Sequence, residues 1–218
     1  MTKLAIFDLD GTLLNTIEDL GLSTNYALRQ CGFPERKLNE YNLLVGRGIY
    51  NLFRGALPKE AATEENVGKM ASFFIPYYDK HLCDNTVPYE GIDDMLSEIT
   101  SKGIGIAVAS NKYQEGAERI VSHYFGRFKF VRILGQRKGS PIKPDPQIVT
   151  EIMTSFGKAD LDEVVYAGDS DVDMETGNNA GVRTIGALWG FRTREEIQKH
   201  SPWRLAENPE ELCKYIIG

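Results

Sequence analysis

The chain has 218 residues, with 25 basic and 31 acidic side chains and a formal net charge of −6 at pH 7. A chain of this length forms one domain or a core with a smaller inserted module, and a hydrophobic content of 42% excludes a disordered or collagen-like protein. The acidic balance provides no positive stripe for duplex nucleic acid or for an anionic membrane surface. We therefore expect neither partner, and local cations would have to hold an anionic substrate.

The cysteines and the apolar runs predict the cellular compartment. Cys31, Cys83 and Cys213 are odd in number and widely spaced, without a Cys-x-x-Cys pair, so we expect reduced thiols rather than disulfides or a zinc site. The first apolar run ends at Asp8, too early for a signal peptide, and none reaches the ~20 residues of a membrane span. These features predict a cytoplasmic protein that crosses no membrane. For the oligomeric state, we expect a monomer or a small homo-oligomer.

Short apolar segments alternate with helical patterns along most of the chain. This alternation is typical of βαβ units, and it predicts an α/β fold with a parallel sheet and helices around it. Strands are expected at residues 3–8, 104–110, 131–134, 164–169 and 183–188. Helices with apolar residues at spacings of three and four are expected at residues 91–102, 114–125, 146–156, 171–180 and 209–217.

The stretch after the first strand breaks this alternation and predicts an inserted helical domain. Successive helices without a strand are expected at residues 16–31, 39–45, 50–57 and 61–83. We place the helical insertion at residues 15–87 and the α/β core at residues 1–14 and 88–218. Glu18 is expected to complete a capping box with Asn15 at the entrance. One continuous α/β domain with long helices is the alternative.

Two carboxylates follow the first strand. Asp8 and Asp10 are two residues apart, so their side chains project from the same side of the extended chain. Like charges ~4 Å apart at an effective dielectric of ~20 repel by about 4 kcal/mol. The pair therefore points to a bound metal or a shared proton, although a single Asp-x-Asp is also common at a solvated strand end.

A second group of acids follows the strand predicted at residues 164–169, where Asp169 and Asp173 occur. Parallel sheets bind ligands outside the carboxyl ends of their strands, so these acids and Asp8 can meet around one cation. Oxygen ligands from few carboxylates are what Mg²⁺ prefers, and the chain has no Cys/His cluster for zinc.

Two further segments supply hydrogen-bond donors and positive charge. Ser110-Asn111-Lys112 follows the strand predicted at residues 104–110, and Lys143 lies shortly before the helix predicted at residues 146–156. Taken singly, Ser110 and Asn111 are ordinary helix caps and Lys143 is an ordinary surface lysine. Together with the acids, they favour an oxyanion-binding site.

The order of these segments resembles the haloacid dehalogenase superfamily, and within it the phosphoglycolate phosphatase-like enzymes. The four superfamily motifs match Asp8-Leu9-Asp10-Gly11-Thr12, Ser110, Lys143 in Lys143-Pro144-Asp145-Pro146, and Gly168-Asp169-Ser170 with Asp173. The resemblance runs along nearly the whole chain. It implies a Rossmann-like core and identifies the helical insertion as the family's cap domain.

The resemblance also implies a Mg²⁺-dependent phosphatase that acts on a small phosphorylated metabolite. Asp8 would be the nucleophile that forms an aspartyl-phosphate, and Asp10 the general acid and base. Ser110 and Lys143 would hold and neutralise the phosphoryl group. The carboxylates of Asp8 and Asp169 and the backbone carbonyl of Asp10 would bind the metal. Asp10 separates the chain from the family's ion-pumping ATPases, which have threonine there, and from its dehalogenases, which lack the second acid.

Other residues are assigned supporting roles. Asp173 would support the metal through water or hydrogen bonds, with a helix-cap role as the alternative. Asn111 is a candidate substrate-binding residue. Arg47, between Gly46 and Gly48 in the insertion, would pair with a substrate carboxylate, and a solvated turn arginine is an equal alternative.

Several related activities remain open from the sequence. The same superfamily includes inorganic pyrophosphatases, sugar phosphomutases and enzymes that cleave phosphonates through an imine on a cap lysine. A non-catalytic phosphate-binding module is a further alternative. The intact set of Asp8, Asp10, Lys143 and Asp169 argues against that module, because a simple binder needs no acid–base carboxylate beside the nucleophile.

Overall fold

The computed structural model describes residues 1–157 and 159–218. Its core is a six-stranded parallel sheet in the order β5-β4-β1-β6-β7-β8. The strands are β1 (Leu4–Phe7), β4 (Gly105–Tyr113), β5 (Phe130–Gln136), β6 (Val164–Gly168), β7 (Arg183–Ala187) and β8 (Arg204–Ala206). The chain builds from β1 to β5 on one side and then crosses to β6 on the other. The carboxyl ends of β1 and β6 therefore lie at the switch point where such sheets bind ligands.

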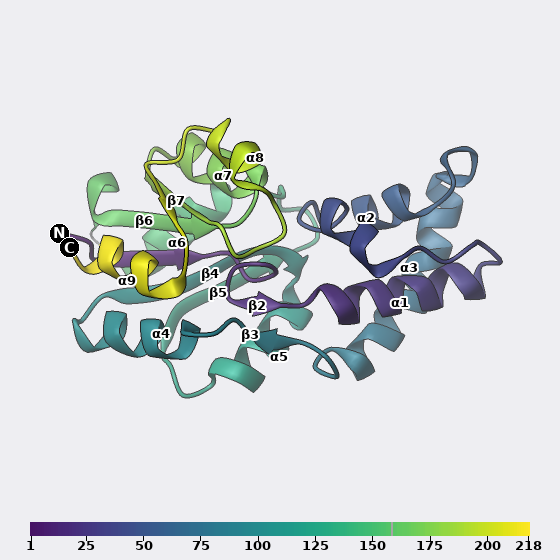
Figure 1. Ribbon diagram of the computed structural model, residues 1–218, viewed down its shortest axis with the longest axis horizontal. Helices are drawn as coiled ribbons and strands as arrows, with labels where there is room; N and C mark the ends of the chain where they lie inside the picture. Colours follow the sequence, from purple (N-terminus) through teal and green to yellow (C-terminus); the bar gives the residue numbers. More distant parts are fainter. Residues whose placement is uncertain (158) are drawn as a thin grey trace.

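The central strand β1 is apolar on both faces because both are covered by helices. Leu4, Ala5, Ile6 and Phe7 are all fully buried, and alternate side chains enter two separate apolar clusters. Figure 1 shows α7 and α8 above the sheet and α4 and α5 below it. The core helices are α4 (Ile92–Ser101), α5 (Gln114–Phe125), α6 (Gln147–Phe156), α7 (Asp171–Ala180), α8 (Arg194–Gln198) and α9 (Pro209–Ile217). The predicted α/β fold, with a parallel sheet and helices around it, is confirmed.

The stretch between β1 and β4 contains a helical segment, residues 16–86, at the far end of the molecule from both chain termini (Figure 1). Its elements are α1 (Ile17–Gln30), the 3₁₀ turn η1 (Leu38–Leu43), α2 (Ile49–Ala56), the 3₁₀ turn η2 (Lys59–Ala61) and α3 (Glu64–His81). The helix expected at residues 61–83 begins later, at Glu64, because Thr63 caps it by accepting a hydrogen bond from the backbone N–H of Asn66.

Two short strands join the helical segment to the sheet. β2 (Leu14–Asn15) and β3 (Val87–Pro88) form an antiparallel ribbon. The capping box expected between Asn15 and Glu18 is wrong. Asn15 pairs with Val87 in this ribbon, and Thr16 takes the cap position of α1 without a side-chain cap bond.

The buried carboxylate of Asp19, on α1, joins the beginning of the helical segment to its end, next to the β2–β3 ribbon. It accepts hydrogen bonds from the backbone N–H groups of Asn85 and Thr86, and from both of their side chains, at 2.8–3.0 Å. Removing the carboxylate would leave the buried donors of Thr86 and the partly buried donors of Asn85 without their acceptor.

Asp19→Ala is therefore expected to lower the free energy of unfolding by about 2–4 kcal/mol, because several hydrogen bonds to a buried charge are lost together. Denaturant unfolding of the full chain measures this loss. Glu18→Ala is the matched control, since Glu18 is exposed on the same helix. Equal stabilities of the two variants would contradict the role of Asp19.

The elements that the sequence analysis missed are short. β8 has three residues, α8 has five, and the strands of the ribbon have two each, so none carries a full apolar repeat. Among the helices of the described residues, none is long and apolar enough to span a membrane.

Candidate active site

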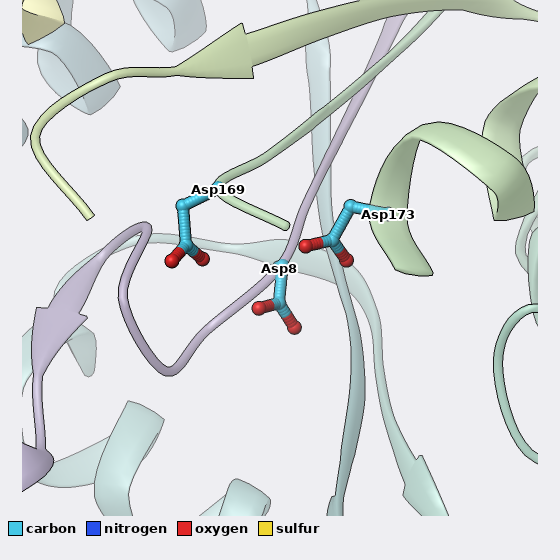
Figure 2. Close-up of side chains that lie close together, drawn as sticks. All are labelled: Asp8, Asp169 and Asp173. Carbon is cyan, nitrogen blue, oxygen red and sulfur yellow. The ribbon is translucent and has the colours of Figure 1, made fainter. Parts of the chain in front are cut away.

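Three carboxylates meet where β1 and β6 end. Figure 2 shows Asp169 and Asp173 on either side of the strand end that carries Asp8. One oxygen from each carboxylate lies within 4.8 Å of the other two, and all three residues are buried. Asp8 directly follows β1, Asp169 follows β6, and Asp173 lies in the first turn of α7. The sequence analysis expected these acids to meet.

The ammonium group of Lys143 lies against this cluster. Its Nζ is 2.7 Å from Oδ1 of Asp8 and 2.7 Å from Oδ1 of Asp173, and it also donates to the carbonyl of Ala109 and the hydroxyl of Tyr166. Burial lowers the pKa of Lys143, but the charges of Asp173 and Asp8 outweigh it and raise that pKa well above its ordinary value. Lys143 is therefore a buried cation whose donors are all engaged.

One lysine does not neutralise three buried carboxylates. Burial, followed by the charge of Asp173, raises the pKa of Asp8 well above its ordinary value. The same two causes raise the pKa of Asp169 to about 7. The cluster has an excess of negative charge, which a bound divalent cation would compensate.

Asp169 is fixed by hydrogen bonds and by close packing. Its Oδ1 accepts from the Thr12 hydroxyl at 3.0 Å, and its Oδ2 accepts from the backbone N–H of Phe191 at 2.7 Å. A Cβ at Gly11 would lie 2.4 Å from this carboxylate, and one at Gly190 would lie 2.2 Å from the Asp169 side chain. Glycine at both positions leaves the space that Asp169 occupies.

Asp173 has three side-chain partners in addition to its place in the cluster, Lys143, Ser170 and the hydroxyl of Tyr166. Its Oδ1 contacts Lys143, and its Oδ2 accepts from the backbone N–H and the hydroxyl of Ser170. The reciprocal bond from the Asp173 N–H to the Ser170 hydroxyl completes a capping box at the start of α7. Asp173 therefore caps α7 and orients Lys143.

Asp10 is paired with a second buried lysine. Nζ of Lys112, at the end of β4, lies 3.0 Å from Oδ1 of Asp10 and donates to the Tyr78 hydroxyl at 2.7 Å. Tyr78 lies on α3, so this chain of contacts joins the helical segment to the sheet. From the sequence, Lys112 is placed only in the donor segment Ser110-Asn111-Lys112, without a separate role.

Ser110 and Asn111 have different surroundings. The Ser110 hydroxyl accepts a bond from the backbone N–H of Lys112 at 3.1 Å, and within the described residues its own proton has no acceptor. The amide nitrogen of Asn111 donates to the carbonyls of Gly46 and Lys143, and its oxygen accepts from the Lys143 N–H. Asn111 therefore links the helical segment to the loop of Lys143, and its contact with substrate stays a prediction.

Arg47 lies away from the carboxylate cluster. Its guanidinium contacts the carboxylate of Asp171, and half of its side chain is exposed. Nearby, Arg192 donates to the carbonyls of Asn42 and Val45. In this arrangement both arginines connect the helical segment to the core, and a contact between Arg47 and substrate stays a prediction.

A narrow pocket of about 30 Å³ opens onto the acids between the sheet and the helical segment. A cavity needs roughly 10–15 Å³ to hold one water molecule, so this pocket is small. Its lining residues are Asp8, Asp10, Leu20, Val45, Gly46, Gly48, Ile49, Leu52, Tyr78, Ser110, Asn111 and Lys112. Carboxylates and donors from the core thus face apolar side chains from α1 and α2.

Comparison with known proteins identifies the family of the chain. Residues 5–187 match the family of haloacid dehalogenase-like hydrolases. The chain belongs to this family. The resemblance found in the sequence is confirmed.

The hydrolase has relatives that match over nearly its full length. It is 30% identical to the phosphoglycolate phosphatase of Aquifex aeolicus, with 98% of this chain and 96% of the relative covered. It is 29% identical to that of Haemophilus influenzae, with 92% of each covered. A structure from Lactobacillus delbrueckii, provisionally assigned as a phosphoglycolate phosphatase, has a TM-score of 0.92 and 31% identity over 99% of each chain. These relationships make the protein a phosphoric monoester hydrolase.

The cluster fits the divalent metal ion that phosphatases of this family generally use. Its donors are carboxylate oxygens, which suit a hard cation such as Mg²⁺ better than zinc. Burial and then the negative charge of Asp173 raise the pKa values of Asp8 and Asp169, and a bound cation would favour the ionised form of both carboxylates. Asp8, Asp169 and the backbone carbonyl of Asp10 are the candidate ligands.

Proposed function

We propose that this hydrolase is a Mg²⁺-dependent phosphatase that cleaves a small phosphate monoester through an aspartyl-phosphate on Asp8, with phosphoglycolate as the first candidate substrate. The observation that carries the proposal is the position of Asp8, which belongs both to the carboxylate cluster and to the pocket lining. Lys143 contacts its Oδ1, and within the described part of the chain no donor contacts its Oδ2. That oxygen is the nucleophile in the proposal.

The first step transfers the phosphoryl group to Asp8. Oδ2 of Asp8 attacks phosphorus, the ester bond breaks, and Asp10 gives its proton to the departing alcohol oxygen. The Ser110 hydroxyl donates to a phosphoryl oxygen, and Lys143 keeps Asp8 in place. A bound Mg²⁺, held by Asp8, Asp169 and the Asp10 carbonyl, would supply the positive charge that offsets the repulsion between carboxylate and phosphate.

The second step releases inorganic phosphate. Asp10, now ionised, accepts a proton from a water molecule, which attacks phosphorus and breaks the bond to Asp8. Asp10 thus acts as acid and then as base, and it is protonated again at the end of the cycle. Its place in the pocket lining beside Asp8 supports both roles.

We further propose that residues 15–87 form a cap domain over a core of residues 1–14 and 88–218. The junctions of this division fall within the β2–β3 ribbon. The pocket that contains Asp8 and Asp10 lies between the sheet and the helical segment, so the cap would open for substrate entry. The ribbon is the proposed hinge.

The competing activities receive less support from the pocket. Phosphonate cleavage through an imine needs a lysine from the helical segment, whereas the lysine that lines the pocket, Lys112, comes from β4. A phosphate-release screen distinguishes an ester phosphatase from a pyrophosphatase and from a module that only binds phosphate. It would compare phosphoglycolate, further small phosphate esters and pyrophosphate, each with Mg²⁺ and with a chelator. Chelator-sensitive release from an ester supports the proposal, and release from pyrophosphate alone would overturn it.

Asp10→Asn is expected to slow hydrolysis of a poorly activated alkyl phosphate by about 10²–10⁴-fold, because the amide cannot transfer the proton. The loss in kcat/KM, which reports the first step, should be smaller for an aryl phosphate, whose phenolate departs without a proton. Steady-state kinetics with the two esters measure both values of kcat/KM. An unchanged rate with the alkyl phosphate would remove Asp10 from the acid–base role.

A further inference from the structure

Lys112 is the cation that lines the pocket. The remaining lining residues are acidic, neutral polar, aromatic or aliphatic, and the helical segment contributes apolar Leu20, Val45, Ile49 and Leu52. Lys143 is not among the lining residues, and its Nζ has four oxygen partners for three N–H groups. A negative charge on the leaving-group side of a substrate would therefore meet Lys112.

Lys112 and Tyr78 each keep one unused donor. Nζ of Lys112 donates to Oδ1 of Asp10 and to the Tyr78 hydroxyl, and its third N–H has no acceptor among the residues that the structure describes. The Tyr78 hydroxyl accepts that bond, while its own proton lacks an acceptor in the same set. Burial raises the pKa of Tyr78 well above its ordinary value, so the hydroxyl keeps its proton. Both residues are almost completely buried.

We propose that Lys112 and Tyr78 together bind a carboxylate carried by the alcohol part of the substrate, one donor to each carboxylate oxygen. The inference rests on the proposed phosphatase function and adds the residues that recognise the anionic tail of a short phosphate monoester. The small pocket and its aliphatic wall select a short tail, and the two donors select its charge. Arg47, which pairs with Asp171 outside this pocket, is not needed for the contact.

The test compares two substrates of similar length, 2-phosphoglycolate with an anionic carboxylate tail and 2-hydroxyethyl phosphate with a neutral hydroxyl tail. The proposal predicts that wild-type protein prefers the acid. In Lys112→Met, the ratio of kcat/KM for the acid to kcat/KM for the neutral ester should fall about 10- to 100-fold, the effect of one charge-assisted contact. The fall should appear mainly in KM. Tyr78→Phe keeps the Lys112–Asp10 pair and should lower the ratio about 10-fold or more, as one hydrogen bond to a charged carboxylate is lost.

Two comparison variants make the result specific. Lys102→Met removes the same charge from an exposed position before the opposite end of β4, and it should leave the ratio unchanged. Arg47→Ala tests the alternative prediction that Arg47 contacts the substrate carboxylate, in which case the ratio would fall in this variant and not in Lys112→Met. Circular dichroism establishes that each variant is folded, and Tyr78→Phe provides the answer if Lys112→Met does not fold.

Three outcomes would overturn the inference while leaving the phosphatase function in place. The first is an equal loss of kcat/KM on both substrates in Lys112→Met and in Tyr78→Phe. The second is a wild-type enzyme that does not prefer the acid, and the third is a fall of the ratio in Arg47→Ala alone. Equal losses would mean that Lys112 and Tyr78 only support Asp10. Failure of the wild-type protein to release phosphate from any ester would instead refute the proposed function itself.

Discussion

Replacing Asp8 by asparagine is expected to reduce phosphate release by about 10⁴-fold or more, because the amide has nearly the same shape but is a very poor nucleophile. The fold should be retained, since Asp8 lies at a strand end and its backbone N–H bond to the carbonyl of Ala167 does not depend on the side chain. Activity with a phosphate ester and the thermal unfolding midpoint are measured on the same preparation.

Asp162→Asn is the matched control for this variant. Asp162 is exposed and lies before β6, at the end of the sheet opposite to Asp169. It should behave as wild type in both measurements. An Asp8→Asn protein that is folded and retains near-wild-type turnover would contradict the assignment of the nucleophile.

Removal of divalent metal is expected to have the second large effect. Chelator should abolish turnover and Mg²⁺ should restore it, because Lys143 alone cannot compensate the carboxylates of Asp8, Asp169 and Asp173. Ca²⁺ should inhibit, since its longer and less regular coordination places Asp8 incorrectly relative to phosphorus. Activity is followed during titration of chelated protein with each metal salt.

Two alanine variants refine this expectation. Asp169→Ala should raise the Mg²⁺ concentration needed for half-maximal activity sharply, because a proposed metal ligand is lost. Asp173→Ala should raise it less, and it should also destabilise the start of α7, where Asp173 caps the helix. Full activity of metal-free wild-type protein would contradict the role given to the cluster.

The acids of the site were predictable because the sheet places them. Asp8 and Asp169 each follow a short apolar run, and the carboxyl ends of parallel strands meet at one edge whatever the loops between them do. Asp8 and Asp169 could therefore be brought together from the sequence. Ser110 and Lys143 could be grouped with these acids as an oxyanion-binding site, and the resemblance to the superfamily supplied their roles. Most strands and helices of the core were predictable for a related reason, since their apolar repeats are long enough to read.

The contacts between the helical segment and the core were not predictable. Lys112 meets Tyr78, and Arg47 meets Asp171, only because α3 and the loop before α2 are held above the strand ends. No spacing in the sequence indicates either pair, and each residue taken alone is typical of core packing or of an exposed surface. The hydrogen bond from the backbone N–H of Phe191 to Asp169 was not predictable either. Any residue at position 191 other than proline has this N–H, so the sequence does not indicate the contact.

The central claim, a phosphoryl group carried by Asp8, is tested most directly by trapping it. Asp10→Asn protein with Mg²⁺ is mixed with an aryl phosphate and quenched in acid, and the phosphate attached to protein is located by mass spectrometry of peptides. With a leaving group that needs no proton, the first step should proceed while the second, which needs the Asp10 base, is slowed. The account predicts a burst of phenolate near one equivalent per active site and phosphate on the peptide that contains Asp8. Steady turnover without a burst and without phosphate on that peptide would contradict it.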